Sequence, residues 1–367
     1  MSTATIAKDR VFNFSAGPAT LPEPVLKQAQ KDCWNIDESG IGIMEHSHRG
    51  KVFDRVIAEA VEDCRAIGNI GDEFEVLFLQ GGASTQFGMI PMSFLGKGQT
   101  ADYADTGVWT TKAIAEGKRF GDVNIAYDGT AGNFDRVPTD SDLNLTDNAA
   151  YFHYCSNNTI YGTRYNTPPA SSAPLICDTS SEMFSRPFDF ASHSMIYAGA
   201  QKNLGPSGVT LVLIRKDFVE KANPEVFSMM NYNKLITGGS RFNTPPAFGI
   251  YMMGQVFKWI LAQGGLEAIE KVNIQKAQLI YDVVDELSDF YKGHSQKDCR
   301  SIMNVTFRTP SDDLDAKFIS EAGTLRMSGL KGHRKVGGIR ASIYNAFPVE
   351  GCEALAQFMR DFAQQNG

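Results

Sequence analysis

The sequence predicts an α/β fold with a mainly parallel, mixed sheet flanked by helices, followed by a smaller C-terminal α+β domain. Short apolar runs with β-branched or aromatic residues recur along the first two thirds of the chain, and helical segments lie between several of them. Such runs suit strands that are buried on both faces. At 367 residues the chain also exceeds the length at which one hydrophobic core stops growing, so two domains are expected.

The first part of the chain begins with helices. A Gly/Pro turn at Ser15–Ala19 precedes a helix that begins near Pro22, because prolines are tolerated in the first turn of a helix. A second helix has apolar residues from Phe53 to Ile67 at the i, i+3, i+4, i+7 spacing of one buried face. The predicted strands that follow are Val76–Leu79, Ala149–Phe152, Pro174–Cys177, Met195–Tyr197 and Val209–Ile214.

The last third of the chain predicts the smaller domain. A long helix with alternating charges runs from Leu266 to about Ser288, and we expect it to bridge the two domains. We therefore place a large domain at residues 23–265 and a small domain at residues 1–22 and 266–367. The further elements predicted for the small domain are a strand at Ile302–Phe307, a helix near Asp313–Glu321, a strand within Gly338–Tyr344 and a helix from Glu350.

Composition excludes several classes of partner. A net charge of −7 argues against nucleic acid or an anionic membrane as the main partner. The six cysteines form no C-x-x-C pair, which argues against a zinc ribbon, a redox motif or a disulfide scaffold. The apolar stretch Ala247–Ala262 is interrupted by Gln255 and Lys258, and the N-terminus lacks the apolar core of a secretory signal. We expect a cytoplasmic protein with reduced thiols, no membrane span and no metal site.

Two predicted strands each end near one charged residue. The apolar run Pro174–Cys177 is followed by Asp178, and a later run leads into the glycine-rich turn that holds Lys202. Pyridoxal phosphate (PLP) requires such a pair, because an amine forms the Schiff base and a carboxylate keeps the pyridine nitrogen protonated. A surface lysine after a strand is the alternative, since lysine is usually exposed.

Three further features fit the same cofactor. The segment Gln80–Gln86 follows a strand and leads toward a helix, so its backbone N–H groups can hold a phosphate. Trp109 can stack on a pyridine ring, and Thr159 can donate its hydroxyl to the phenolic oxygen. Taken singly, each has an ordinary alternative: a tight turn, a core tryptophan and a turn threonine.

Two His-Arg dipeptides indicate an anionic substrate. They are His48-Arg49 and His333-Arg334, and Arg340 follows the second. Arginine binds carboxylates and phosphates through a planar fork, and protonated histidine adds donors. Their number suggests a substrate with two anionic ends, although each could instead be a solvated surface charge.

Five motifs together resemble the phosphoserine aminotransferases, which are class-V aminotransferases of the PLP-dependent fold type I. The resemblance covers almost the whole chain, and several motifs recur in order over about 330 residues. That order is more specific than any single motif. The motifs are Phe12–Pro18, Ser47–Gly50, Ala198–Asn203, Phe242–Pro246 and Gly332–Tyr344.

The resemblance implies a role for each candidate residue. Lys202 is implied as the Schiff-base lysine, Asp178 as the pyridinium partner and Trp109 as the stacking ring, while Thr159 contacts the phenolic oxygen. It implies a homodimer in which the neighbouring subunit supplies two of the phosphate contacts. The implied phosphate contacts are Ala83, Ser84 and Gln201, with Asn243 and Thr244 from the neighbouring subunit, and the implied substrate residues are His48, Arg49, His333, Arg334 and Arg340.

The implied activity is reversible transamination of 3-phosphohydroxypyruvate with L-glutamate, giving O-phospho-L-serine and 2-oxoglutarate in serine biosynthesis. The phosphorylated 3-hydroxy-2-oxobutanoate step of pyridoxine biosynthesis is left open. One departure concerns the phosphate cup, where Ser84 stands in place of the arginine of some relatives. We expect this change to affect cofactor affinity more than chemistry.

Two alternative functions compete with this one. Another enzyme of the same fold, such as a cysteine desulfurase or an alanine–glyoxylate aminotransferase, would share Lys202. Desulfurases typically have histidine before that lysine, whereas Gln201 precedes it in this chain, and no cysteine lies in an obvious glycine-rich loop. A non-catalytic protein that binds an anionic metabolite on the same scaffold would need neither Lys202 nor Asp178.

Overall fold

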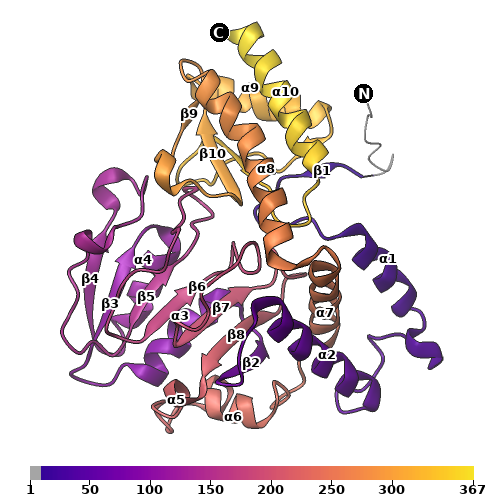
Figure 1. The fold of residues 1–367 in the computed structure, drawn as a ribbon, viewed down its shortest axis with the longest axis vertical. Coiled ribbons are helices and arrows are strands. Elements are labelled where there is room, and N and C mark those ends of the chain that lie inside the picture. The colour runs from indigo at the N-terminus through magenta and orange to yellow at the C-terminus, as the bar shows by residue number, and fades with distance from the viewer. Residues whose placement is uncertain (1–9) are drawn as a thin grey trace.

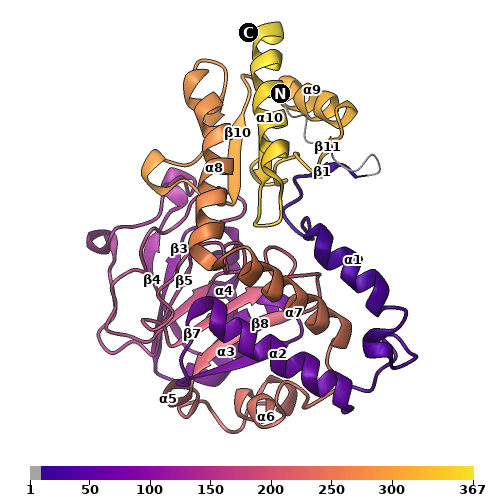
Figure 2. The same cartoon turned by 45° about the vertical axis from the view of Figure 1, so that its right-hand side comes forward.

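The computed structural model describes residues 10–367 and contains a mixed seven-stranded sheet with helices on both faces. The strand order is β2-β8-β7-β6-β5-β3-β4, and only the pairings of β8 with β2 and β7 are antiparallel. Figures 1 and 2 show this sheet below a second group of elements that contains both ends of the described chain. The strands of the sheet are β2 (Phe74–Leu79), β3 (Thr100–Asp105), β4 (Asp122–Asp128), β5 (Phe152–Cys155), β6 (Leu175–Asp178), β7 (Met195–Gly199) and β8 (Thr210–Arg215).

Alternation along the strands divides the large apolar core between the two sheet faces. Phe78 and Leu211 pack with α2 and α7 on one face, whereas Leu79 and Val212 pack with α3 and α4 on the other. Strands such as β2 and β8 are largely apolar on both faces because helices cover both sides of the sheet. The helices around the sheet are α1 (Glu23–Asp32), α2 (Lys51–Gly68), α3 (Gly82–Phe94), α4 (Val108–Gly117), α5 (Lys216–Val219), α6 (Tyr232–Thr237) and α7 (Ala247–Ala262).

The C-terminal elements build a separate core. The antiparallel sheet β12-β10-β9 packs with α8, α9 and α10, and the short strand β1 pairs in parallel with β11. The long helix α8 descends from this group toward the end of α7 (Figure 2). The bounds are β1 (Phe12–Asn13), α8 (Gly265–Glu286), β9 (Lys292–Gly293), β10 (Asn304–Arg308), α9 (Asp312–Thr324), β11 (Met327–Ser328), β12 (Ile339–Ser342) and α10 (Val349–Asn366).

The predicted α/β class with a mainly parallel, mixed sheet is confirmed. One predicted strand is displaced: the strand expected at Ala149–Phe152 is observed at Phe152–Cys155, although Ala150 and Tyr151 already form backbone hydrogen bonds with β3. β3 and β4 were not predicted from the sequence. The boundaries of the two domains stay a prediction. Within residues 10–367, no helix has both the length and the apolar character needed to cross a membrane.

Candidate active site

The candidate residues meet at one edge of the sheet. The carboxyl ends of parallel strands lie side by side, and open α/β sheets bind ligands beyond that edge. In register, Cys155 pairs with Asp178, and Asp178 pairs with Tyr197. Trp109 lies in the first turn of α4, which follows β3, and the loops after β5 and β7 carry Thr159 and Lys202 toward the same region.

Lys202 lies in the turn after β7, and its ammonium points at two predicted partners. Its Nζ donates to the Thr159 hydroxyl at 2.5 Å and lies 5.6 Å from the centre of the Trp109 ring. Burial lowers the pKa of the amine to about 8, although the Asp178 carboxylate opposes the shift. A lysine with a lowered pKa has more of its amine in the neutral, nucleophilic form near neutral pH.

Asp178 ends β6 and is 3% exposed. Its Oδ1 accepts a hydrogen bond of 2.9 Å from the backbone N–H of Ser180, while the Ser180 hydroxyl accepts one from the N–H of Gly199. Burial raises the pKa of this carboxyl despite the Ser180 contacts and the charge of Lys202. A cationic nitrogen placed beside Asp178 would supply the stabilisation that the carboxylate lacks.

Buried hydrogen bonds hold the first turn of α4, which carries Trp109, and the loop that carries Thr159. Asp105 accepts from the N–H of Gly107 and from the Thr110 hydroxyl, which fixes the start of α4 next to Trp109. Asn158 donates to the backbone carbonyl of Thr106 at 2.7 Å, so the loop after β5 is tied to the loop after β3. The positions of both side chains are therefore set by the strands behind them.

The glycine-rich segment after β2 forms the start of α3. Gly81 and Gly82 have φ angles of 91° and 66°, a left-handed conformation that glycine adopts without steric cost. Ala83 and Ser84 lie in the first turn of the helix, where backbone N–H groups have no partner within the helix and can bind an anion. The predicted cup therefore has the backbone geometry of a phosphate site.

Residues near the cup come from two further segments. Gln201 precedes Lys202, and its side chain lies beside Gly199. In the same chain, Gln80 donates to the carbonyl of Thr244 at 3.2 Å, and Asn243 lines a cavity of about 290 Å³ that extends to Gly81. Gln201 thus lies beside the lysine turn, while Asn243 and Thr244 lie by the loop after β2 of their own chain, and their predicted contact with a neighbouring subunit stays a prediction.

Among the predicted substrate residues, Arg340 contacts the residues around Lys202. It lies on β12, and its Nη1 donates to the Thr159 carbonyl at 3.4 Å. Its buried Nε has no hydrogen-bond partner within residues 10–367. His333 lies on the adjoining loop, where burial and then the charges of Arg340, Arg334, Lys335 and Lys112 lower its pKa. This region therefore favours an anion.

Within one chain, the structure shows no contact between the pair His48-Arg49 and the residues around Lys202 in residues 10–367. The backbone carbonyl of His48 accepts a hydrogen bond from the Arg241 side chain. Arg241 also forms an ion pair with Asp54. His48 thus contacts the segment before Asn243, and the side chain of Arg49 is exposed.

Sequence reasoning missed three residues. Gly17 packs on the lysine turn, since a Cβ there would lie 3.2 Å from the Gln201 carbonyl and 3.5 Å from Cγ of Lys202. Ser180 orients Asp178, and Lys112 has its ammonium 4.8 Å from the centre of the Trp109 ring. The helical i, i+3 spacing of Trp109 and Lys112 was a usable signal, whereas the contact of Gly17 was not visible in the sequence.

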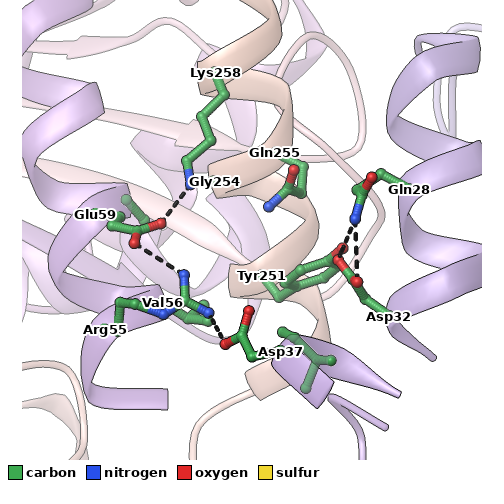
Figure 3. Close-up of a pocket in the computed structure, with 12 residues that line it drawn as sticks. Gln28, Asp32, Asp37, Arg55, Val56, Glu59, Tyr251, Gly254, Gln255 and Lys258 are labelled. Carbon is green, nitrogen blue, oxygen red and sulfur yellow. Dashed lines mark hydrogen bonds and ion pairs between the residues drawn. The ribbon is translucent and has the colours of Figure 1, made fainter. Parts of the chain in front are cut away.

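A separate cavity of about 160 Å³ lies between α1, the 3₁₀ turn Ile36–Glu38, α2 and α7 (Figure 3). Its charged side chains are paired with one another rather than directed at an empty centre. We assign it no catalytic role, because the strand ends do not reach it. The pairs are Gln28 with Asp32, Tyr251 with Asp32, Arg55 with Asp37, Arg55 with Glu59, and Lys258 with Glu59.

Comparisons with known proteins place this geometry in a family. The model of the aminotransferase class-V family matches residues 11–355. The chain belongs to the class-V aminotransferases. It is 50% identical to a phosphoserine aminotransferase of Desulfotalea psychrophila over 358 residues, which cover 98% of this chain and 99% of the relative.

Two solved structures have the same fold. A phosphoserine aminotransferase from Bacillus circulans subsp. alkalophilus has a TM-score of 0.96 and 48% identity, covering 98% of this chain and 100% of that one. A PLP-bound phosphoserine aminotransferase from Trichomonas vaginalis has a TM-score of 0.91 and 38% identity, covering 96% of this chain and 100% of that one.

The residues at the strand edge fit this cofactor. A buried amine with a lowered pKa, a buried carboxylate with a raised pKa and an indole ring surround one region. No ion pair joins Lys202 to Asp178 in residues 10–367, so the carboxylate remains available to a ring nitrogen. In the same range, no group of three or more His, Cys, Asp or Glu residues is arranged to hold a metal ion.

Proposed function

We propose that the protein is a PLP-dependent aminotransferase that transfers the amino group of L-glutamate to 3-phosphohydroxypyruvate, giving 2-oxoglutarate and O-phospho-L-serine. The observation that carries the proposal is the buried Lys202 amine, which contacts Thr159 and faces Trp109 at the sheet edge where Asp178 ends its strand. Full-length identity of 50% to a phosphoserine aminotransferase supports this choice of substrate.

Lys202 holds the cofactor and moves the proton. Pyridoxal phosphate, when bound, withdraws electrons from the substrate Cα as its proton leaves. With the cofactor bound, Lys202 Nζ in its neutral form would accept that proton and, as a general acid, would return it to the carbon that carries the aldehyde group of the free cofactor. A pKa of about 8 suits both tasks near neutral pH. Asp178 would keep the ring nitrogen of the cofactor protonated, and Trp109 would stack against the ring.

Positive side chains around Arg340 bind the substrate. Arg340 takes the α-carboxylate, because its buried Nε lacks a partner and a carboxylate can accept from it. The pairs His333-Arg334 and His48-Arg49 bind the distal anion, which is a carboxylate in glutamate and a phosphate in phosphoserine. Arg340 and His333 are close enough for the charge of Arg340 to lower the pKa of His333.

The proposal includes a homodimer in the cytoplasm. Exposed apolar side chains support an interface, since Phe227 is 69% and Phe242 is 41% exposed, and Phe242 directly precedes Asn243 and Thr244. We propose that these two residues reach the cofactor phosphate of the neighbouring subunit. We also propose a large domain at residues 23–265 and a small domain at residues 1–22 and 266–367. Separate apolar cores support that division.

Borohydride reduction tests the cofactor and phosphoserine turnover tests the substrate. Reduction of the purified yellow protein followed by peptide mapping should place a pyridoxyl group on Lys202. In a separate sample of unreduced protein, phosphoserine with 2-oxoglutarate should give glutamate at a rate far above that with alanine or cysteine. A label on another lysine would refute the role of Lys202, and preference for alanine or cysteine would refute the substrate.

The matched variant is Lys202→Ala. It should retain the fold, lose the covalent label and lose amino-group exchange. Full exchange by Lys202→Ala would end the proposal.

A further inference from the structure

A buried lysine fixes the turn that follows β12. Lys276 on α8 is fully buried, and its ammonium donates to the backbone carbonyls of Ile343, Tyr344 and Phe347 at 3.0, 2.7 and 3.2 Å. A buried amine must have hydrogen-bond acceptors whether or not it is charged, so the turn converges on this one atom. The conformation of residues 343–347 is thereby fixed from α8.

The same turn is joined to the lysine loop by two asparagines. The backbone N–H of Asn345 donates to Oδ1 of Asn203 at 3.0 Å. The Asn345 side chain donates to the Phe184 carbonyl at 2.8 Å and accepts from Asn273 at 2.9 Å. Asn203, Asn345 and Asn273 are at most 6% exposed, so water cannot readily replace these partners.

These contacts connect two residues of the candidate active site. Arg340 lies on β12, which leads into the turn of Asn345, and Asn203 directly follows Lys202. On the other side, Arg340 donates to the carbonyl of Thr159, whose hydroxyl accepts from Lys202. The substrate-binding guanidinium and the reactive amine are therefore linked by two routes, and Asn203 completes one of them.

We propose that Asn203 is a positioning residue that fixes the Lys202 turn relative to Arg340. Asn203 acts through the Asn345 N–H and does not itself touch the substrate. The proposal rests on the proposed function, because it assumes that Arg340 binds the substrate carboxylate while Lys202 moves the proton. Both half-reactions use this pair of residues, so both depend on the same separation.

The expected effect follows from geometry. A misplacement of about 1 Å between reacting groups can reduce a rate by about 100-fold. We therefore expect Asn203→Leu, which fills the space but removes the acceptor, to slow both half-reactions by about 10- to 100-fold. Residues at the distal anion should behave differently, because they distinguish glutamate from phosphoserine.

The matched control is Asn273→Ala. It removes the bonds of Asn273 to Asn345 and to the Ser185 carbonyl at the same junction, but leaves the bond between Asn345 and Asn203. Single-turnover rates with glutamate and with phosphoserine are measured on the PLP-loaded wild type, Asn203→Leu, Asn203→Ala and Asn273→Ala. Melting temperature and the pH midpoint of the visible cofactor absorbance are recorded for each.

The proposal is supported if both Asn203 variants lose tenfold or more in both half-reactions and shift the absorbance midpoint, while Asn273→Ala stays within about threefold of the wild type. It is overturned if Asn203 variants keep their rates, if only one half-reaction slows, or if Asn273→Ala slows equally. Failure of both Asn203 variants to fold also overturns it, because Asn203 would then serve folding rather than positioning.

Failure of the proposed function would look different. The wild-type protein would then accept another amino donor in place of phosphoserine, or none. If the wild type uses another amino donor, the single-turnover rates of the same variants are compared with that donor. The role of Asn203 is then supported or overturned by those rates. A wild type that lacks any amino-group exchange would refute the proposed function and the role of Asn203 together.

Discussion

Replacement of Gly17 by alanine tests how closely the N-terminal segment supports the lysine turn. Gly17 has a φ of 136°, and an added Cβ would lie 3.2 Å from the Gln201 carbonyl oxygen, 3.3 Å from Gln201 Cγ and 3.5 Å from Lys202 Cγ. The first cost is conformational, because a side chain at such a φ is strained by about 1–3 kcal/mol. The second is contact, since Gln201 must shift by a few tenths of an ångström.

Gly208→Ala separates these two costs. Gly208 has a φ of 112°, and an added Cβ would meet no atom within 4 Å. Both variants should lose about 1–3 kcal/mol in the free energy of unfolding from backbone strain. Gly17→Ala should lose more, and it should also lower kcat about tenfold because the Lys202 turn moves. Gly208→Ala should keep kcat within about twofold of the wild type.

Urea unfolding and the single-turnover rate with glutamate measure the two effects. The slope of the unfolding free energy against urea should stay constant, so that midpoints report stability. If Gly17→Ala lost no more stability than Gly208→Ala and kept a wild-type rate, the N-terminal segment would not support the lysine. The reasoning from Cβ contacts would then be wrong.

Three other predictions follow from the site and the α8 junction. Arg334→Ala should lower kcat/KM about 10- to 100-fold for phosphoserine but much less for glutamate, because a charge-assisted hydrogen bond to phosphate is lost; steady-state assays with both donors, and Lys335→Ala as the control, check this. Lys276 has a pKa lowered from 10.5 to about 7 by burial, so the unfolded state binds more protons between these values and stability should rise with pH. From pH 7 to pH 10, the free energy of unfolding of the wild type, measured with urea, should rise by roughly 3 kcal/mol more than that of Lys276→Met. An equal dependence on pH in the two proteins would contradict the prediction. Thr159→Val removes the hydroxyl that Lys202 contacts and should slow the glutamate half-reaction up to about tenfold; an unchanged single-turnover rate would show that this contact is dispensable.

The sequence predicted elements best where apolar residues dominate. β8 is apolar almost throughout, and its predicted span Val209–Ile214 differs by one residue at each end from the observed Thr210–Arg215. β3 was missed because strands were predicted from apolar runs, and β3 carries aspartates. Asp102 is fully buried there, and it accepts hydrogen bonds from the Asn124 side chain and the Thr146 backbone. Those partners are set by tertiary structure, so the local sequence cannot reveal them.

The candidate site shows the same limit. Residues that follow strands, such as Asp178 and Lys202, could be found because one rule places all such positions at one sheet edge. Lys276 lies in a helix whose alternating charges predict exposure, yet it is fully buried. Its acceptors are backbone carbonyls near Tyr344, far along the chain. A contact between a side chain and distant backbone leaves no pattern in residue types.

Electrostatics explain why Lys202 and Asp178 require a third charged group. Burial lowers the pKa of Lys202 to about 8 although Asp178 opposes this, so desolvation outweighs the attraction between the two charges. Burial also raises the pKa of Asp178. If the pair served only to stabilise the fold, a direct ion pair would reduce both costs. The two residues form none within residues 10–367, so the Asp178 carboxylate remains free to pair with a cationic ring nitrogen and Lys202 remains free to react as an amine.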